Sequence, residues 1–326
     1  MSKKQITLED MQPATHKGAS VRRFFRNFRR DWQLYALILL PVIYICIFYY
    51  WPMYGVQIAF RDYRPKDGIL GSEWVGLKWF TKFIKSRQFT EVITNTVVLS
   101  LYNLFASFPL AIILALMLNN ITRHKFGRIV QTVSYIPYFF STTVLLAIVD
   151  MLLSPVTGVY GNFYHLFGGE GIPHDFRGDE NVFRHLYVWS GVWQHLGWDA
   201  IIYTAALTGV PKELHEAAKV DGASRLRRIL HVDLPCIMPT AGMMFILKCG
   251  SVLSVGFEKA YLLQSNLNLG TAEVISTYVY KVGMGSFRDF SFGAAIGLFN
   301  AVVNLAMVIL ANTVSKKISD NNVSIF

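Results

Sequence analysis

Six long apolar runs follow one another along the chain, and shorter polar segments separate them. The runs extend over Trp32 to Phe60, Val92 to Leu118, Ile129 to Leu153, Leu186 to Val210, Thr240 to Leu263, and Phe290 to Thr313. Each is longer than the roughly 18 to 20 residues that an α-helix needs to cross about 30 Å of hydrocarbon. The pattern therefore predicts six transmembrane helices. Prolines inside the first three runs predict kinks that neighbouring helices accommodate.

The composition agrees with a membrane protein. The 326-residue chain is 53% hydrophobic and 14% aromatic, and only 16% of its residues are charged, whereas about 25% is usual in a soluble domain. A soluble enzyme with a large buried core would need shorter apolar runs. We therefore predict an all-α membrane protein.

The distribution of charge predicts the orientation of these helices. With the N-terminus inside the cell, the cytoplasmic segments carry 18 Lys and Arg and the outer segments carry 11. The positive-inside rule then places both termini in the cytoplasm. The predicted domains are a basic tail (1–31), a six-helix domain (32–313) with a cytoplasmic loop at 211–239, and a C-terminal tail (314–326). The first outer loop departs from the rule because it holds seven of the outer Lys and Arg.

The N-terminal tail ends in a basic and aromatic stretch, VRRFFRNFRRDW at 21–32. A cleavable signal peptide is not expected, because the first apolar run begins only at Trp32 and is longer than the apolar part of a signal. Arg interleaved with Phe fits an anchor along anionic lipid headgroups better than a nucleic-acid site. Membrane lipid is therefore an expected partner, and nucleic acid is not.

Motifs for metal binding, disulfides and nucleotide binding are missing from the sequence. Cys46, Cys236 and Cys249 form no CxxC pair, and the eight histidines show no HExxH spacing. His195 near Asp199 fits a hydrogen-bonded polar pair better than a metal site or a proton relay. Without a GxxxxGK[ST] motif, any uphill transport needs an ion gradient or another subunit. We expect no catalytic residue, metal or cofactor in this chain.

A charged stretch, ELHEAAKVDGASRLRRILHVDLP at 213–235, lies in the longest predicted cytoplasmic loop. Glu213 and Glu216 occupy positions where a helix dipole favours acids, and Gly222 after Asp221 predicts a turn. A second, basic helix is expected over 224–231 and is expected to end before Pro235. From the residues alone, these two short helices fit either an amphipathic connector or a docking element.

The same stretch resembles the EAA loop of ATP-binding cassette (ABC) importer permeases. The resemblance rests on Glu216, Ala217, Ala218 and Gly222, followed by Val232, Leu234 and Pro235, with Val232 where the family more often has Ile. Further stretches resemble permeases of bacterial oligosaccharide and polysaccharide importers: NNITRHKFGRIVQTVSYIPYFFSTTVL (119–145), GWDAIIYTAALTGVPKELHEAA (197–218), GFEKAYLL (256–263), TYVYKVGM (277–284) and FSFGAAIGLFNAVVN (290–304). Together they cover most of residues 30–315.

The resemblance implies a type I ABC importer permease fold in a bacterial cytoplasmic membrane. It implies four kinds of partner: a second related permease, two copies of an ATPase that uses the ATP, an extracytoplasmic solute-binding protein, and a saccharide. A permease for an acidic polysaccharide such as alginate is one candidate. The loop would dock into a groove of the ATPase through Glu213, Glu216, Ala217, Ala218, Asp221, Gly222, Leu234 and Pro235. Small alanines permit close approach, and Gly222 permits a sharp turn.

The substrate pathway is predicted from aromatic and charged residues within the spans. Sugars bind to flat aromatic platforms with polar neighbours, which selects Trp193, His195, Trp198, Tyr203, Lys248 and Lys259. For any single tryptophan, interfacial location or packing between helices is the more ordinary explanation. A lysine within the membrane at position 248 is expected to face a cavity or to snorkel to the surface, because a charge in lipid is costly.

Lys248 and the basic first outer loop together suggest a polyanionic ligand. The alternative is that this loop binds an acidic face of the solute-binding protein or simply tolerates its charges.

Two other classes of protein remain open. An ion-coupled secondary transporter would use a similar bundle, but it would show inverted repeats, and we find no convincing internal repeat. A membrane-embedded enzyme would need clustered His and carboxylates, and Asp150, His195 and Asp199 are scattered along the sequence.

Overall fold

The computed structural model describes residues 31–121, 124–250, 255–285 and 288–318, and the chain divides into two compact units, 1–57 and 58–326. The predicted basic tail lies outside the described residues apart from Asp31. The predicted C-terminal tail lies outside them beyond Ile318.

One apolar helical segment forms the described part of the first unit. It consists of α2 (Trp32–Ile45), a π-helical turn η2 (Cys46–Tyr50) and α3 (Trp51–Met53), and it leads into the 3-10 helix η3 (Tyr54–Phe60). The π-helical turn directly precedes the short helix that contains Pro52, as expected where a proline removes a helical N–H. The whole segment, Trp32–Phe60, is long and apolar enough to cross a membrane, which agrees with the first predicted span.

The second unit begins with a small folded loop that contains β1 (Arg61–Asp62), α4 (Gly68–Gly71), β2 (Glu73–Trp74) and α5 (Lys78–Ile84). The two strands are antiparallel, and Arg61 pairs with Trp74 in the register. The Arg61 guanidinium donates hydrogen bonds to the carbonyls of Ser72 (2.8 Å) and Leu70 (3.2 Å). One arginine of the basic loop therefore stabilises the loop itself.

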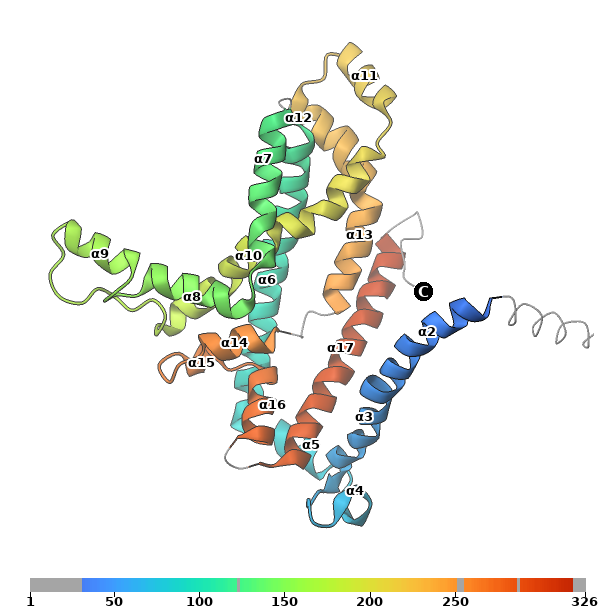
Figure 1. Ribbon diagram of the computed structural model, residues 1–326, viewed down its shortest axis with the longest axis vertical. Helices are drawn as coiled ribbons and strands as arrows, with labels where there is room; N and C mark the ends of the chain where they lie inside the picture. The colour runs from blue at the N-terminus through green and yellow to red at the C-terminus, as the bar shows by residue number, and fades with distance from the viewer. Residues whose placement is uncertain (1–30, 122–123, 251–254, 286–287, 319–326) are drawn as a thin grey trace, which may run out of the picture. The chain divides into compact units, whose positions relative to one another are not determined.

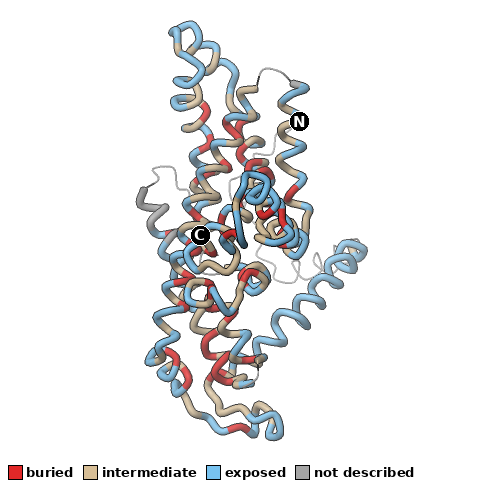
Figure 2. The backbone as a smooth tube through the Cα atoms, turned by 90° about the vertical axis from the view of Figure 1, so that its left-hand side faces the viewer, coloured by how far each residue is buried: buried red, intermediate tan, exposed pale blue. Residues whose placement is uncertain are grey.

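Helices α6 (Arg87–Asn119) and α10 (Glu180–Thr208) form the centre of the second unit. Buried residues of α6 belong to three separate apolar clusters: with α5, α16 and α17; with α8, α10, α14 and α15; and with α10 and α13. Figure 2 shows buried segments, in red, along the long helices, whereas the tip that carries α11 is largely exposed. Helix α6 is therefore the element that connects the clusters.

The third predicted span is divided into two helices at a sharp bend, where the sequence predicted a kink within one helix. Helix α7 (His124–Tyr135) and the 3-10 turn η4 (Ile136–Phe139) are followed by α8 (Thr142–Leu153) at a bend of 105°. Phe140 has extended backbone, and Ser141 then caps α8 by accepting a hydrogen bond from the N–H of Val144. Helices α8 and α9 (Val159–Leu166) extend away from α6 and α7 (Figure 1).

The fifth predicted span begins earlier than expected, because Pro235 does not end the preceding helix. Helix α12 (Arg225–Arg228), the π-helical turn η5 (Ile229–Asp233) and α13 (Leu234–Gly250) form one helical segment, Arg225–Gly250. The wide π-helical turn lies directly before the proline, where an ordinary helical hydrogen bond is lost. The predicted end of the run at Leu263 belongs instead to a separate helix, α14 (Phe257–Leu263).

The chain then forms α15 (Leu269–Ala272), α16 (Ile275–Met284) and α17 (Phe290–Ile318). Within the described ranges, four helices are long and apolar enough to span a membrane: Trp32–Phe60, Arg87–Asn119, Arg225–Gly250 and Phe290–Leu310. The bent pair formed by α7 and α8 makes five if it counts as one span. Six spans are therefore not confirmed, and the cytoplasmic location of both termini stays a prediction. The fourth predicted run lies in α10, whose 29 residues include several polar side chains.

Close packing of α10 on α7 depends on Gly197. A Cβ added there would overlap the Ser134 carbonyl oxygen and lie 2.9 Å from the Tyr135 ring, so the two backbones can approach this closely only at a glycine.

We expect Gly197→Ala to lower the free energy of unfolding by about 1–3 kcal/mol, because the backbone of α7 must move to make room. Gly297→Ala on α17 is the matched control, since a Cβ there meets nothing within 4 Å. Chemical denaturation of the purified protein in detergent measures both. Equal stability of the two variants would contradict the close approach.

Candidate functional site

A cavity of about 400 Å³ lies against one face of α10. Four of its lining residues follow each other at intervals of four along that helix: Tyr187, Gly191, His195 and Asp199. Residues four apart lie on the same side of an α-helix. Lys248 of α13 and both Glu258 and Lys259 of α14 also line it, and α6 contributes Asn103 and Ser107.

An ion pair crosses this cavity wall. The Lys248 Nζ lies 2.6 Å from Asp199 Oδ2, and the two side chains are 31% and 25% exposed. A charge inside a membrane span is costly unless it is paired or faces water. Pairing with Asp199 in a cavity therefore accounts for a lysine at this depth in α13.

Lys259 also lines the cavity, but its side chain has other partners than that of Lys248. Its Nζ donates a hydrogen bond of 2.7 Å to the Tyr187 carbonyl and lies 4.8 Å from the centre of the Tyr187 ring. The Tyr187 hydroxyl in turn accepts a hydrogen bond of 3.1 Å from the Gly256 N–H. Tyr187 thus fixes both the lysine and the start of α14.

The predicted aromatic pathway residues lie outside this cavity. Trp198 stacks on Tyr138 of η4, with ring centres 4.2 Å apart and planes 3° apart, and Trp193 lies 6.3 Å from Phe140. Both tryptophans are about half exposed. Tyr203 is 1% exposed and packs in the cluster that joins α6, α10 and α13, so the structure places it in the apolar core.

Three of the six predicted pathway residues, His195, Lys248 and Lys259, thus line one cavity. Tyr187 and Gly191 were missed by sequence reasoning. The four-residue spacing from Tyr187 to Asp199 is a signal in the sequence that selects the whole face. The selection by aromatic type chose Trp193, Trp198 and Tyr203, and none of the three lines the cavity.

The charged loop forms a helix, a tight turn and a second helix start. Helix α11 (Lys212–Val220) ends in a Schellman motif, in which the N–H groups of Gly222 and Ala223 donate to the carbonyls of Lys219 (3.0 Å) and Ala218 (2.8 Å). Gly222 has φ of +74°, which confirms the predicted turn. The Ser224 side chain then caps α12 by accepting a hydrogen bond from the Arg227 N–H.

Most of the predicted docking residues are accessible. Exposed are Glu213, Glu216, Ala217, Asp221, Gly222 and Pro235, whereas Ala218 and Leu234 are half-buried. Apolar side chains of Val220 and Leu226 are also exposed, at 89% and 65%. The helix lies at the end of the second unit opposite α5 (Figure 1). The loop therefore presents a mixed acidic and apolar surface at one end of the bundle.

A buried carboxylate connects this loop to the bundle. Asp233 is 0% exposed, and its Oδ1 lies 3.1 Å from Nε2 of His215 in α11. Its Oδ2 accepts a hydrogen bond of 3.4 Å from the Asn120 side chain at the end of α6. Sequence reasoning missed both His215 and Asp233, because their contact joins residues that are 18 positions apart across the turn.

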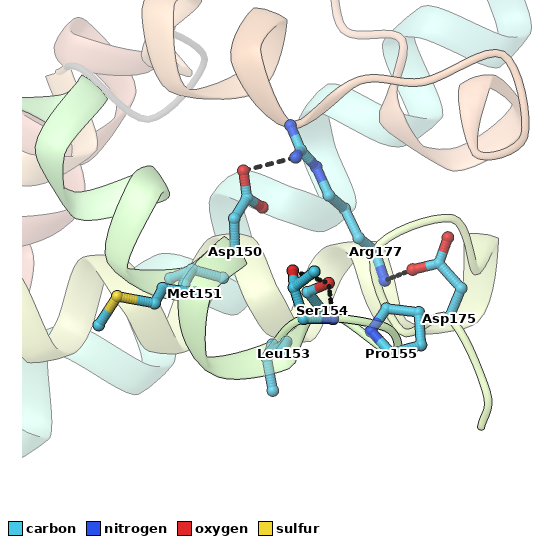
Figure 3. Close-up of a pocket in the computed structure, with 9 residues that line it drawn as sticks. Asp150, Met151, Leu153, Ser154, Pro155, Asp175 and Arg177 are labelled. Atoms are coloured by element: carbon cyan, nitrogen blue, oxygen red, sulfur yellow. Dashed lines mark hydrogen bonds and ion pairs between the residues drawn. The ribbon is translucent and has the colours of Figure 1, made fainter. Parts of the chain in front are cut away.

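A second cavity, of about 430 Å³, lies at the end of α8 (Figure 3). Arg177 bridges it, with Nη1 2.5 Å from Asp150 Oδ2 and Nη2 donating to the Leu262 carbonyl at 3.0 Å. The Arg177 N–H donates to the Asp175 carboxylate at 3.0 Å. Because Arg177 is neutralised by Asp150 and tied to α14, its geometry is that of a structural brace for the loop before α10.

The same loop ends in the N-cap of α10. The Asp179 carboxylate accepts a hydrogen bond of 2.8 Å from the Asn181 N–H and lies 2.8 Å from His174 Nε2. Two hydrogen bonds lower the pKa of the Asp179 carboxyl: the one from the Asn181 N–H has the larger effect, and the one with His174 has the smaller. Asp179 therefore stays ionised, as an N-cap acid requires.

Comparison with known proteins gives consistent matches over nearly the whole chain. A family described as binding-protein-dependent transport system inner membrane component matches residues 107–320. The chain is similar to the polygalacturonan/rhamnogalacturonan transport system permease protein YteP of Bacillus subtilis (strain 168), at 43% identity over 97% of this chain and 99% of the relative. It is similar to protein LplB of the same organism at 39% identity, over 89% of this chain and 90% of LplB.

Solved structures are similar as well. One is the crystal structure of a bacterial alginate ABC transporter in complex with an alginate pentasaccharide-bound periplasmic protein. A chain of it matches with a TM-score of 0.81 and 38% identity, over 91% of this chain and 99% of that one.

The ion pair in the cavity wall can be measured by a double-mutant cycle. We expect Lys248→Ala and Asp199→Ala each to lower the free energy of unfolding by about 1–3 kcal/mol, because each removes the ion pair between these two partly buried side chains. The double variant should lose less than the sum of both by roughly 1 kcal/mol. Denaturant unfolding in detergent gives these values.

The exposed pair Arg87 and Glu91, at 3.0 Å, is the control, and its coupling should be about 0.3–0.5 kcal/mol. A cavity pair that couples no more strongly than this surface pair would refute the assignment.

Proposed function

This chain belongs to the family of binding-protein-dependent transport system inner membrane components, and we propose that it is the permease subunit of an ATP-driven importer of oligosaccharides or polysaccharides. Its place is the bacterial inner membrane, as one half of a translocation pathway that a second, related permease completes. A separate ATPase dimer hydrolyses ATP, and an extracytoplasmic solute-binding protein delivers the substrate.

The observation that carries the proposed coupling role is the exposed loop anchored by Asp233. An element that transmits force needs an accessible surface for its partner and a stiff connection to the moving part. Glu216 and Ala217 are exposed on α11, and the contacts of Asp233 with His215 and Asn120 tie α11 to α6. We propose that this loop docks on the ATPase, with Glu216 pairing with a cation of that subunit.

The mechanism follows from this connection. ATP binding closes the ATPase dimer and draws the coupling loops of the two permeases together. Because α11 is tied to α6 and is followed, after the turn at Gly222, by the helical segment Arg225–Gly250, the helices that line the cavity then tilt with it. Access to the cavity switches from one side of the membrane to the other, which is a rigid-body transition between two packed states.

The named substrates of the relatives support a narrower proposal. YteP is described as a polygalacturonan/rhamnogalacturonan permease, and the matched structures are of alginate transporters. Polygalacturonan and alginate are polymers of uronic acids, so we propose an acidic saccharide for this chain. The basic first outer loop supports this only in part, because Arg61, Lys82 and Arg87 have partners within the chain.

An ion-coupled secondary transporter is the alternative reading of the same bundle. Family membership and the similarity to ABC transport permeases favour the importer.

We expect Glu216→Lys to leave the subunit folded and assembled but to reduce uptake by about tenfold or more, because a reversed charge at a docking surface costs several kcal/mol. The measurement is substrate-stimulated ATP hydrolysis and uptake of labelled oligosaccharides by the complete complex in proteoliposomes. Substrates should include neutral and uronic acid oligomers.

Glu91→Lys is the control, because it makes the same charge reversal on an exposed position of α6. It should keep wild-type coupling. If Glu216→Lys also keeps wild-type uptake and stimulated hydrolysis, the coupling role of this loop is wrong.

A further inference from the structure

The two lysines of the cavity differ in how their charge is balanced. Lys248 has a carboxylate partner, Asp199, at 2.6 Å. Among the residues that the structure describes, no carboxylate oxygen lies within the 4.0 Å ion-pair distance of the Lys259 Nζ, whose hydrogen bond goes to the neutral Tyr187 carbonyl. The carboxylate next to it in sequence, on Glu258, accepts instead from Thr143 of α8 at 3.5 Å.

The Lys259 ammonium also keeps hydrogen-bonding capacity. An ammonium carries three N–H donors, and one of them donates to the Tyr187 carbonyl. The Lys259 side chain is half-buried and lines the cavity of about 400 Å³, where its two other N–H donors are available to a ligand. A cation removed from bulk water and left without an anion favours an anionic ligand strongly.

The absence of a side chain at Gly191 leaves space for the Lys259 ammonium. A Cβ built at position 191 would lie 2.8 Å from the Lys259 Nζ, which is the atom that a side chain at this position would meet. The helix face that lines the cavity therefore has a gap where the lysine head lies. Any side chain at this position would push the ammonium aside.

We propose that Lys259 binds a carboxylate of an acidic sugar while the sugar passes through this cavity, an inference that rests on the proposed importer function. The ammonium pairs with one or both oxygens of the uronate. Ser107 and Asn103 in the same wall offer a hydroxyl and an amide to the sugar hydroxyls, and the Phe257 ring offers an apolar surface to the sugar ring. Lys248, already neutralised by Asp199, keeps the wall together and does not discriminate charge.

The test uses trigalacturonate and its fully methyl-esterified form, in which each carboxylate is replaced by an uncharged methyl ester. The complete complex, with its partner permease, ATPase and solute-binding protein, is reconstituted in proteoliposomes. Uptake of each ligand is measured over a range of concentrations, and the acid-to-ester ratio of uptake efficiencies is the readout. Lys259→Met should lower this ratio by about tenfold or more, because a site built to pair a charged group loses that pairing.

Three further variants separate a binding role from a structural one. Lys259→Arg keeps a cation and should retain more of the ratio than Lys259→Met. Gly191→Ala displaces the ammonium without removing it and should lower the ratio to an intermediate value. Lys281→Gln is the control, because it removes a lysine that pairs with Glu273 at 2.8 Å and does not line the cavity. It should leave the ratio at the wild-type value.

An unchanged acid-to-ester ratio in Lys259→Met overturns the inference. It is also overturned if Lys259→Met and Lys259→Arg both reduce the uptake of the two ligands equally, because that result indicates a packing role. A wild-type complex that imports other oligosaccharides but not trigalacturonate overturns the inference and leaves the importer function intact. A wild-type complex that imports no saccharide overturns both.

Discussion

A fully buried carboxylate holds together the parts of this protein on which the proposed coupling depends. Asp233 contacts His215 of α11 on one side and Asn120 at the end of α6 on the other. Removal of a charge from water is unfavourable unless its partners remain in place. These contacts therefore favour one arrangement of the three segments, and in the proposed coupling mechanism a displacement of α11 would reach α6 and the helix that begins at Arg225.

The arrangement of the cavity depends on the same helices. Helix α6 joins the three apolar clusters and contributes Asn103 and Ser107 to the cavity wall. Helix α10 packs closely on α7 at Gly197 and presents its face from Tyr187 to Asp199 to the cavity. A tilt of α6 relative to α10 would change this wall directly. A connection between the proposed coupling loop and this cavity thus needs no long chain of intermediates, because α6 contacts the loop and also lines the cavity.

The sequence predicted the elements whose signals are local. Hydropathy alone located the spans at Trp32–Phe60, α6 and α17, and the turn at Gly222 followed from its glycine. Local signals failed where tertiary contacts decide. Pro235 suggested a helix end, but the π-helical turn before it lets the helix continue. Similarly, the break at Phe140 is held by the Gln194 side chain, which donates to the Phe140 carbonyl at 2.8 Å from a different helix.

The candidate site, like the fold, was predicted only in part from the sequence. Charged residues within apolar runs pointed to Lys248 and Lys259, because a charge in a span needs a polar environment. Aromatic type selected Tyr203, which the structure places in the core. The pairs that organise the site, Lys248 with Asp199 and His215 with Asp233, join residues on different helices, and a single sequence without a fold does not show which of them meet.

The central claim, that Asp233 makes α11 and the end of α6 one body, can be tested by distances between spin labels. Labels are placed on the exposed positions Lys212 of α11 and Met117 of α6, in complete complex in which the three native cysteines of this chain and any cysteines of its partner subunits have been replaced. We predict one narrow distance distribution that is the same with and without ATP, and a broad one in His215→Ala, which removes the contact of α11 with Asp233. A distribution that is already broad in the wild type, or one that stays narrow in His215→Ala, would contradict the account.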